Sequence, residues 1–299
     1  MIFIFYILAA LLLFLSYKSF RGGIAYLNFF KSELAKSRSG FTPFASIIVP
    51  CRGIDNELEI NLSRLFRQDY PAYEVIFVVD DEADAAVPVI EDVSREAAKD
   101  AVTTKLVIAA KANESSQKVE NLREAASHVS DNSRVFVFVD SDARPGENWL
   151  RNLVAPLQDE TIGAATGYRW FFSQQQTFAS EMRAVWNASI ASALGPNTKT
   201  NFCWGGSMAI RRDVFEKLGI LEKWRGTLSD DFTVTRAMNE ANLPIYFVPQ
   251  ALIASIESCT FAGLLEFTTR QMKITRVYAS KLWVMSFFGS GLFNLVLVW

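Results

Sequence analysis

Two aspartates separated by a single serine are the strongest candidates for chemistry in this sequence. Asp140 and Asp142 follow the apolar run RVFVFV at 134–139, which predicts a buried strand. Alternate residues after a strand can direct both carboxylates at one hard cation, and few protein carboxylates leave positions open for phosphate oxygens. The same residues would also suit a plain turn before Pro145-Gly146. Their place after a strand favours a site for Mg²⁺ or Mn²⁺ at Asp140 and Asp142.

A second acidic group follows another predicted strand. Asp80, Asp81 and Asp84 come after the run YEVIFVV at 73–79. Carboxylates at this position could accept hydrogen bonds from a nucleotide base or a ribose. A solvated acidic loop explains the local sequence equally well, so both interpretations stay open.

A third acidic group, Ser229-Asp230-Asp231, opens a helix predicted at 230–241. Serine and aspartate are common N-caps, and acids at a helix N-terminus are favoured by the helix dipole, which is a purely structural explanation. The alternative is a general base, with Asp231 taking a proton from a hydroxyl group. His128 is the single histidine of the chain, which argues against a histidine triad or a zinc cluster and favours a carboxylate base.

A group of polar and basic residues lies on an amphipathic helix predicted at 261–278. Its members are Arg270, Gln271, Lys273 and Arg276. On an interfacial helix they could bind anionic lipid headgroups. In an active site they could neutralise a leaving diphosphate, and the local sequence does not separate these two roles.

Short apolar runs alternate with helical segments in the first half of the chain. Continuous apolar strands that alternate with helices indicate an α/β fold with a mostly parallel sheet covered on both faces. Ligands of such sheets bind beyond the carboxyl ends of the strands, where the first two acidic groups stand. The predicted strands are 45–50, 73–79, 105–109 and 134–139, and the predicted helices between them are 57–67, 87–99 and 118–128.

The second half of the chain is less regular. Its main local feature is the turn Trp204-Gly205-Gly206-Ser207, whose glycines expose the backbone. The predicted strands here are 162–170 and 243–248, and the predicted helices are 178–194 and 213–218.

Both ends of the chain are apolar. Residues 1–17 carry no charge and are just long enough, at about 1.5 Å per residue, to cross a membrane. A cleaved signal peptide is the alternative, but no basic segment precedes the run, so an uncleaved anchor is favoured. Residues 18–38 contain five basic residues and one acid, which places the following chain in the cytosol by the positive-inside rule. The uncharged run at 282–299 is either a final short span or part of a longer membrane domain.

Composition excludes some classes of function. The net charge is only −2, so no basic field indicates binding to nucleic acid. Cys51, Cys203 and Cys259 are odd in number, far apart and not in metal-ligand spacing. We interpret them as reduced thiols on the cytosolic side of a membrane.

Several segments occur in an order and at a spacing that resemble a known group of enzymes. They are Pro50–Asp84, Lys118–Leu122, Val139–Asp142, Gly205–Met208 with Arg212–Val214, and Ser229–Phe232. Taken together, they resemble the glycosyltransferases of families 2 and 21, which have the GT-A fold. The similarity is greatest to ceramide glucosyltransferase-like enzymes and covers about Ala45 to Tyr278.

This resemblance implies a domain organisation for an integral membrane enzyme. A GT-A catalytic domain, Rossmann-like with a mostly parallel sheet, is expected at 45–260 on the cytosolic side. A transmembrane anchor at 1–17 and a juxtamembrane linker at 18–44 precede it. An amphipathic interfacial helix at 261–281 and an apolar membrane segment at 282–299 follow it.

The resemblance also implies a reaction and the residues for it. The expected reaction is inverting transfer of a hexose from a nucleotide sugar, which the resemblance implies is UDP-linked, to a lipid hydroxyl such as that of ceramide. Asp81, Asp84, Lys118, Asp140, Gly205 and Gly206 would contact the nucleotide sugar, and Asp140 and Asp142 would hold Mg²⁺ or Mn²⁺. Asp231, with Asp230 beside it, would be the catalytic base, and Arg270, Gln271, Lys273 and Arg276 would contact the diphosphate or the acceptor.

One departure from the family pattern keeps alternatives open. Lys273 and Ile274 stand where the family has arginine and tryptophan, and lysine lacks the planar fork of arginine. A catalytically silent membrane subunit that binds a nucleotide sugar is therefore one alternative. A processive polysaccharide synthase is the other, although it would need more membrane spans than the two apolar runs seen here.

Overall fold

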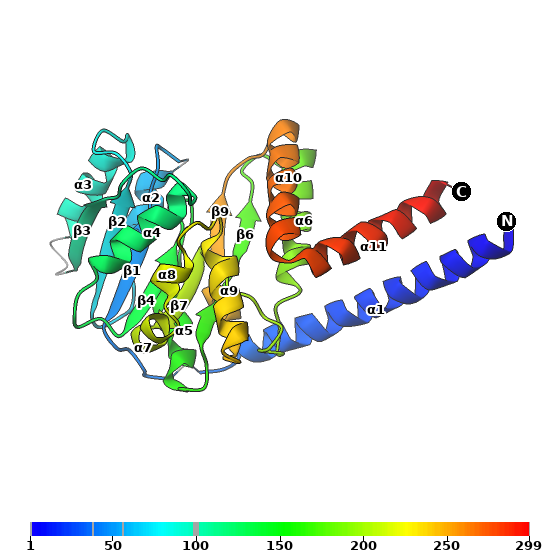
Figure 1. Ribbon diagram of the computed structural model, residues 1–299, viewed down its shortest axis with the longest axis horizontal. Coiled ribbons are helices and arrows are strands. Elements are labelled where there is room, and N and C mark those ends of the chain that lie inside the picture. The colour runs from blue at the N-terminus through cyan, green and yellow to red at the C-terminus, as the bar shows by residue number, and fades with distance from the viewer. Residues whose placement is uncertain (1, 38, 56, 98–101, 299) are drawn as a thin grey trace.

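A seven-stranded mixed sheet forms the centre of the computed structural model, which describes residues 2–37, 39–55, 57–97 and 102–298 (Figure 1). The predicted segments and domains also include residues 1, 38, 56, 98–101 and 299, which lie outside the described residues. The strand order is β3-β2-β1-β4-β7-β5-β8, and β7 is antiparallel to both of its neighbours while the other pairs are parallel. The strands are β1 (Ala45–Pro50), β2 (Tyr73–Val79), β3 (Thr103–Ile108), β4 (Val135–Val139), β5 (Ala164–Thr166), β7 (Ser207–Arg211) and β8 (Ile245–Phe247).

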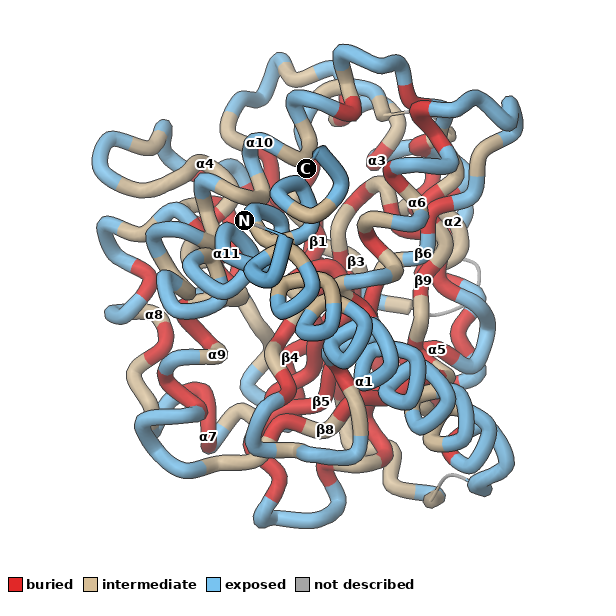
Figure 2. The backbone as a smooth tube through the Cα atoms, turned by 90° about the vertical axis from the view of Figure 1, so that its right-hand side faces the viewer, coloured by how far each residue is buried: buried red, intermediate tan, exposed pale blue. Residues whose placement is uncertain are grey.

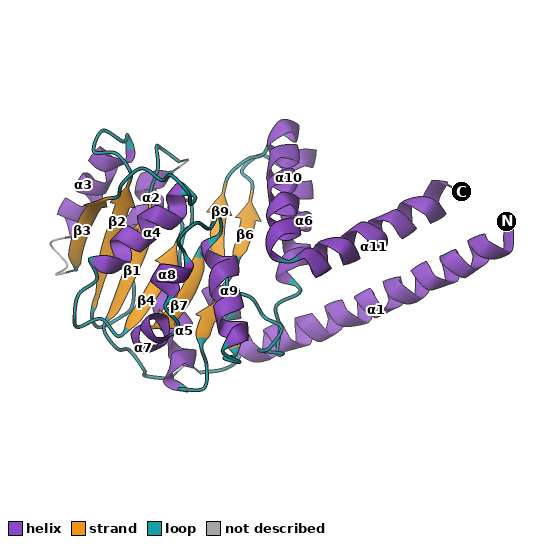
Figure 3. Cartoon of the chain, viewed as in Figure 1, coloured by secondary structure: helices purple, strands orange, loops and turns teal. Residues whose placement is uncertain are grey.

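Helices cover both faces of this sheet, as the apolar strands predicted (Figure 3). Successive residues of β1 point to opposite faces, so that Ile47 and Val49 join one core and Ile48 joins the other. The first core is closed by α2 (Leu58–Arg64), α3 (Ala86–Ala97) and α5 (Trp149–Val154). The second is closed by α4 (Gln117–Ser127), α7 (Arg212–Lys217), α8 (Ile220–Lys223) and α9 (Asp230–Glu240).

The single strand predicted at 162–170 is wrong, because the chain leaves the central sheet at Gly167. After β5 it forms β6 (Arg169–Phe172), which pairs with β9 (Ile253–Ile256) in a separate two-stranded sheet. A Cβ atom at Gly167 would lie 2.0 Å from the carbonyl oxygen of Ala251. Only glycine allows the two backbones to approach this closely, so the switch between sheets occurs there.

Two long apolar helices leave the sheet domain on the same side (Figures 1 and 2). The helix α1 (Ile2–Leu34) continues unbroken past residue 17, and α11 (Ser280–Val298) runs beside it. Each is long and apolar enough to cross a membrane, and none of the apolar window of either helix is buried in the protein. Just before α11, α10 (Phe261–Tyr278) packs against α6 (Phe178–Ala191).

Glu33 fastens the end of α1 to the sheet domain. It is buried, and its carboxylate accepts a hydrogen bond from Tyr246 Oη at 2.8 Å. Its carbonyl oxygen accepts one from the side chain of Gln250, in the short 3₁₀ helix Pro249–Ala251, and Lys36 pairs with its carboxylate. A buried carboxylate with several partners holds the apolar helix in a defined position on the domain.

Candidate active site

The Asp140-Ser141-Asp142 segment lies at the carboxyl end of β4, the middle strand of the sheet. Here the parallel half of the sheet meets the antiparallel strand β7. A change of strand order of this kind leaves a crevice beyond the strand ends, where α/β proteins bind ligands. Ser141 Oγ donates a hydrogen bond to Asp55 Oδ2 at 2.9 Å, which fixes the segment to the loop after β1.

Lys118 brings a positive charge to Asp140 from the first turn of α4. Ser116 caps this helix by accepting a hydrogen bond from the backbone N–H of Val119. Lys118 Nζ lies 2.7 Å from Asp140 Oδ1 and 3.4 Å from Asp230 Oδ1. Burial alone would lower the pKa of Lys118, but these carboxylates outweigh it and raise the pKa, so the ammonium group stays charged.

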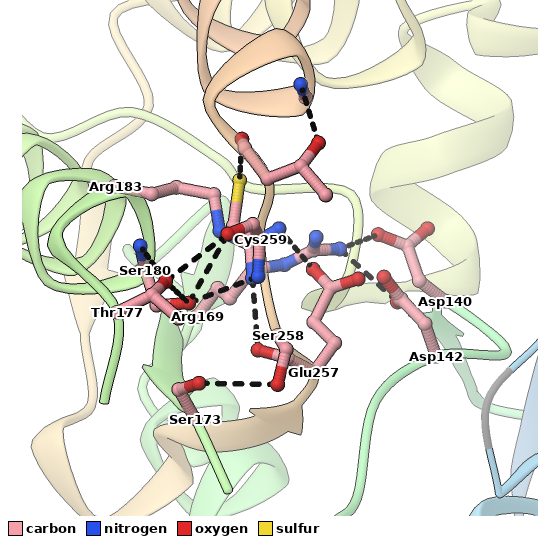
Figure 4. A network of polar contacts seen from close by, with 12 residues as sticks. Asp140, Asp142, Arg169, Ser173, Thr177, Ser180, Arg183, Glu257, Ser258 and Cys259 are labelled. Carbon is pink, nitrogen blue, oxygen red and sulfur yellow. Dashed lines mark hydrogen bonds and ion pairs between the residues drawn. The ribbon is translucent and has the colours of Figure 1, made fainter. Parts of the chain in front are cut away.

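Arg169, the first residue of β6, contacts both carboxylates of the motif (Figure 4). Its Nη2 lies 3.1 Å from Asp140 Oδ2 and 3.1 Å from Asp142 Oδ1. The guanidinium carbon is 5.3 Å from the ring centroid of Phe171 and 5.2 Å from that of Trp204, so the cation lies against aromatic rings. Burial alone would raise the pKa of Asp140, but Lys118 and Arg169 together lower it.

Asp230 and Asp231 begin α9, and the structure gives them different surroundings. Ser229 is the N-cap, so neither aspartate has to cap the helix. Asp230 is buried against Lys118, whereas Asp231 is half-buried. Asp231 Oδ1 accepts hydrogen bonds from Ser229 Oγ and from the Phe232 N–H at 2.7 Å. Asp231 is therefore oriented and partly accessible, as a base would need to be.

Gly205 and Gly206 pass so close to these carboxylates that no side chain would fit. A Cβ atom at Gly205 would lie 2.0 Å from Asp230 Oδ2, and one at Gly206 would lie 2.7 Å from Asp140 Oδ2. The Gly205 N–H donates to Asp231 Oδ2 at 3.4 Å. The two glycines thus line the carboxylate cluster with backbone atoms, and both are buried.

Asp84 and Asp81 lie farther along the same edge of the sheet. Asp84 Oδ1 accepts hydrogen bonds from the N–H groups of Gly53 and Ala86, each at 2.8 Å, and so shapes the loop that carries Asp55 to Ser141. Asp81 is exposed and pairs with Lys111 at 3.4 Å. Asp84 is therefore connected to the cluster through this loop, whereas Asp81 is exposed to solvent.

The basic group of α10 lies apart from the carboxylates. Lys273 and Arg276 line a pocket of about 300 Å³ between α10 and α11, and the Arg276 guanidinium carbon lies 5.4 Å from the Trp283 ring centroid. Arg270 is exposed on the same helix and Gln271 is half-buried. These four predicted residues thus share one helix, but two of them face the membrane-helix junction.

The end of α10 nevertheless contacts the residue that follows the predicted base. Tyr278, its last residue, accepts a hydrogen bond from the Leu228 N–H at 2.8 Å. The Tyr278 ring stacks on that of Phe232, with centroids 5.6 Å apart. Since Phe232 follows Asp231 directly, the membrane-side helices contact the helix that carries Asp231.

The carboxylate cluster fits a hard divalent cation. Burial raises the pKa of Asp142 to about 6 and that of Asp230 to about 6, with neighbouring carboxylates adding to each effect. Asp230 Oδ2 is buried without a hydrogen-bond partner among the described residues. A cation would relieve this excess of negative charge. The described residues contain no group of three or more His, Cys, Asp or Glu side chains that could hold a metal ion. A cation held by Asp140 and Asp142 would have only these two protein ligands and would keep positions for phosphate oxygens.

Sequence reasoning missed Arg169, Glu257 and Tyr278. The one available signal for Arg169 is a lone cation within the apolar stretch 168–172. Burial alone would lower the pKa of Arg169, but the carboxylates of Asp142, Asp140 and Glu257 raise it.

We expect Gly205→Ala to destabilise the protein, because the new methyl group would displace Asp230 from Lys118. Overpacking of this kind costs about 1–3 kcal/mol, which corresponds to a loss of roughly 3–10 °C in Tm. Thermal unfolding of the full-length chain in detergent measures this. Gly146→Ala is the matched control, since a Cβ there meets nothing within 4 Å. Equal Tm values for the two variants would contradict the close packing around Gly205.

Comparison with known proteins identifies the family. The profile of glycosyl transferase family 21 matches residues 6–299. A ceramide glucosyltransferase of Komagataella phaffii is 35% identical over 78 residues, which are 24% of this chain and only 15% of that enzyme. Both matches agree with the resemblance seen in the sequence.

Solved structures show the same fold. The mannosyltransferase PcManGT from Pyrobaculum calidifontis, in complex with GDP-Man and Mn²⁺, superimposes with a TM-score of 0.54 at 20% identity, over 89% of this chain and 72% of that chain. GalNAc-T7 with UDP, GalNAc and Mn²⁺ gives a TM-score of 0.50 at 15% identity, over 73% of this chain and 44% of that one. These likenesses confirm the GT-A fold. The chain is a glycosyltransferase and belongs to glycosyl transferase family 21.

Proposed function

We propose that this chain transfers a hexose from a nucleotide sugar, with UDP as the expected nucleotide, to a hydroxyl group of a membrane lipid, with inversion at the anomeric carbon. The observation that carries the proposal is the convergence of Asp140, Asp142, Lys118 and Asp231 at the carboxyl end of β4. The helix that carries Asp231, α9, also contacts α10, which is followed by α11.

The diphosphate of the donor would lie at the cationic side of this cluster. Asp140 and Asp142 would hold Mg²⁺ or Mn²⁺, which supplies positive charge to a diphosphate leaving group. Lys118 offers a second positive charge from the N-terminal turn of α4, where backbone N–H groups also favour anions. PcManGT and GalNAc-T7, solved with nucleotides and Mn²⁺, support this arrangement.

Asp231 is the proposed base. It would take the proton of the acceptor hydroxyl while the hydroxyl oxygen bonds to the anomeric carbon and the bond from that carbon to the diphosphate oxygen breaks. Attack from the face opposite the leaving group gives inversion. Asp231 is more exposed than Asp230, which is paired with Lys118, and this difference favours Asp231 in the role.

The acceptor would enter from the membrane side. If α1 and α11 lie in the bilayer and the sheet domain in the cytosol, Tyr278 and the α10–α11 junction would lie between the membrane and Asp231. Arg270, Gln271, Lys273 and Arg276 are proposed to contact the diphosphate or the acceptor headgroup from α10. The partial match to a ceramide glucosyltransferase supports ceramide or a comparable lipid as the acceptor.

We expect Asp231→Asn to lower turnover by about 10²–10⁴-fold, because the amide cannot accept the hydroxyl proton. Nucleotide binding should stay close to that of the wild type. The assay follows radiolabelled hexose from UDP-sugars into membrane lipid extract, with product identified by mass spectrometry, and Asp131→Asn on an exposed loop is the control.

Two results of this assay would overturn the proposal. If Asp231→Asn turned over at the wild-type rate, Asp231 would not be the catalytic base. Label recovered in a high-mass aqueous polymer, with none in the organic phase, would instead favour a polysaccharide synthase.

We expect Asp142→Ala to abolish the part of UDP binding that depends on Mn²⁺, because one of the two proposed metal ligands is lost. Isothermal titration calorimetry with and without Mn²⁺ measures this dependence, with Asp131→Ala as the control. Mn²⁺-dependent binding that survives in Asp142→Ala would place the metal elsewhere.

A further inference from the structure

A protein cation already occupies the carboxylates proposed to hold the metal. Arg169 Nη2 lies 3.1 Å from Asp140 Oδ2 and 3.1 Å from Asp142 Oδ1, and Lys118 Nζ lies 2.7 Å from Asp140 Oδ1. Three of the four carboxylate oxygens of the two aspartates therefore face positive side chains. A divalent cation needs oxygens of the same groups as ligands, so it competes with these contacts.

Of the two cations, Arg169 is the one that bridges both aspartates. Its backbone is held by the pairing of β6 with β9, and its carbonyl oxygen accepts a hydrogen bond from Asn187 Nδ2 at 2.8 Å. Its side chain is only 15% exposed and lies against Trp204 and Phe171. A planar guanidinium in such a setting is well placed to hold two carboxylates together.

Arg169 also has a third acid within reach. Glu257, directly after β9, lies beside the Arg169 guanidinium in Figure 4 and already pairs with Arg183 at 2.8 Å. Arg169 Nε is buried and has no hydrogen-bond partner among the described residues, so its present position leaves part of its donor capacity unused. A shift toward Glu257 would keep the guanidinium paired after it leaves the two aspartates, which a buried charge requires.

We propose that Arg169 is an internal counterion that competes with the divalent cation for Asp140 and Asp142 and is released toward Glu257 when the metal binds. This inference rests on the metal site of the proposed function. It gives Arg169 a positioning role: it keeps two neighbouring carboxylates together in the absence of metal, and it lowers the affinity of the free enzyme for metal. The nucleotide diphosphate, by adding its own ligands to the metal, would then favour the exchange.

The contact with Trp204 links this exchange to the proposed base. Trp204 precedes Gly205, whose N–H donates to Asp231 Oδ2 at 3.4 Å. Movement of the Arg169 guanidinium would change the packing of Trp204 and therefore the turn that contacts Asp231. Metal binding on one side of the cluster would thus change the contacts of Asp231 on the other side.

The test measures Mn²⁺ binding to the full-length protein in detergent without any nucleotide, from the signal of free Mn²⁺ in electron paramagnetic resonance. Arg169→Gln removes the competing charge. Because hydrogen bonds to charged groups are worth about 1.5–3 kcal/mol, the variant should bind Mn²⁺ roughly 10- to 100-fold more tightly than the wild type. Arg212→Gln is the control, because Arg212 likewise pairs with a carboxylate, that of Glu216, and lies 5.9 Å from the ring centroid of Phe136. Its Mn²⁺ affinity should equal that of the wild type.

A second variant changes the affinity in the opposite direction. Glu257→Gln weakens the alternative partner of Arg169, so it should reduce Mn²⁺ affinity by several-fold while keeping a side chain of the same shape. Opposite changes in the two variants are not expected from loss of folding, which would weaken binding in both. Thermal unfolding confirms that each variant is folded, and Arg169→Lys, with an intermediate gain, replaces Arg169→Gln if the latter does not fold.

The outcomes separate this inference from the proposed function. If the wild type binds Mn²⁺ and a folded Arg169→Gln binds it no more tightly, competition by Arg169 is wrong and the metal site stands. If neither the wild type nor any variant binds Mn²⁺, with or without UDP, both the metal site and the competition are wrong.

Discussion

The balance of buried charge at the carboxyl end of β4 is the constraint on which the rest of the site depends. Asp230 is buried and the side chains of Asp140 and Asp142 are partly buried, and carboxylates removed from water are costly unless cations or hydrogen-bond donors face them. Lys118 from α4 and Arg169 from β6 offset this cost by pairing with the carboxylates. The two cations come from elements on different sides of the central strand, so the charges are balanced only in the assembled domain.

The irregular half of the sheet contributes to this balance of buried charge. The antiparallel strand β7 returns along β4 and brings the preceding glycines against the carboxylates, where any side chain would collide. The chain leaves the central sheet at Gly167, and the small sheet of β6 and β9 then carries Arg169 and Glu257 to the same place. A regular parallel sheet would bring only the ends of its own strands to the site, whereas this arrangement adds a second wall to it.

The membrane helices are coupled to the site by packing. One aromatic contact joins Tyr278, at the end of α10, to Phe232 beside Asp231, and α11 begins two residues after Tyr278. At the other edge, buried Glu33 ties α1 to Tyr246. These two attachments hold the sheet domain against the two apolar helices, so the proposed lipid acceptor and nucleotide-sugar donor would meet at one cluster of residues.

Local periodicity was sufficient to predict the elements that are regular along the chain. The strand at 73–79 and the helix at 261–278 have the predicted bounds, because a continuous apolar run and an amphipathic repeat are properties of neighbouring residues. Motif spacing similarly indicated Asp140, Asp142, Lys118 and Asp231, and the structure brings these four together.

Only the tertiary structure decided the rest. It gave Asp230 and Asp231 different surroundings, divided the predicted strand at 162–170, and brought Arg169 into contact with the carboxylates of Asp140 and Asp142. Arg169 reaches them through pairing between strands far apart in the chain, and the sequence carries no local trace of that pairing. The sequence by itself therefore determined which residues could do the chemistry, while long-range pairing and burial decided which charges face one another.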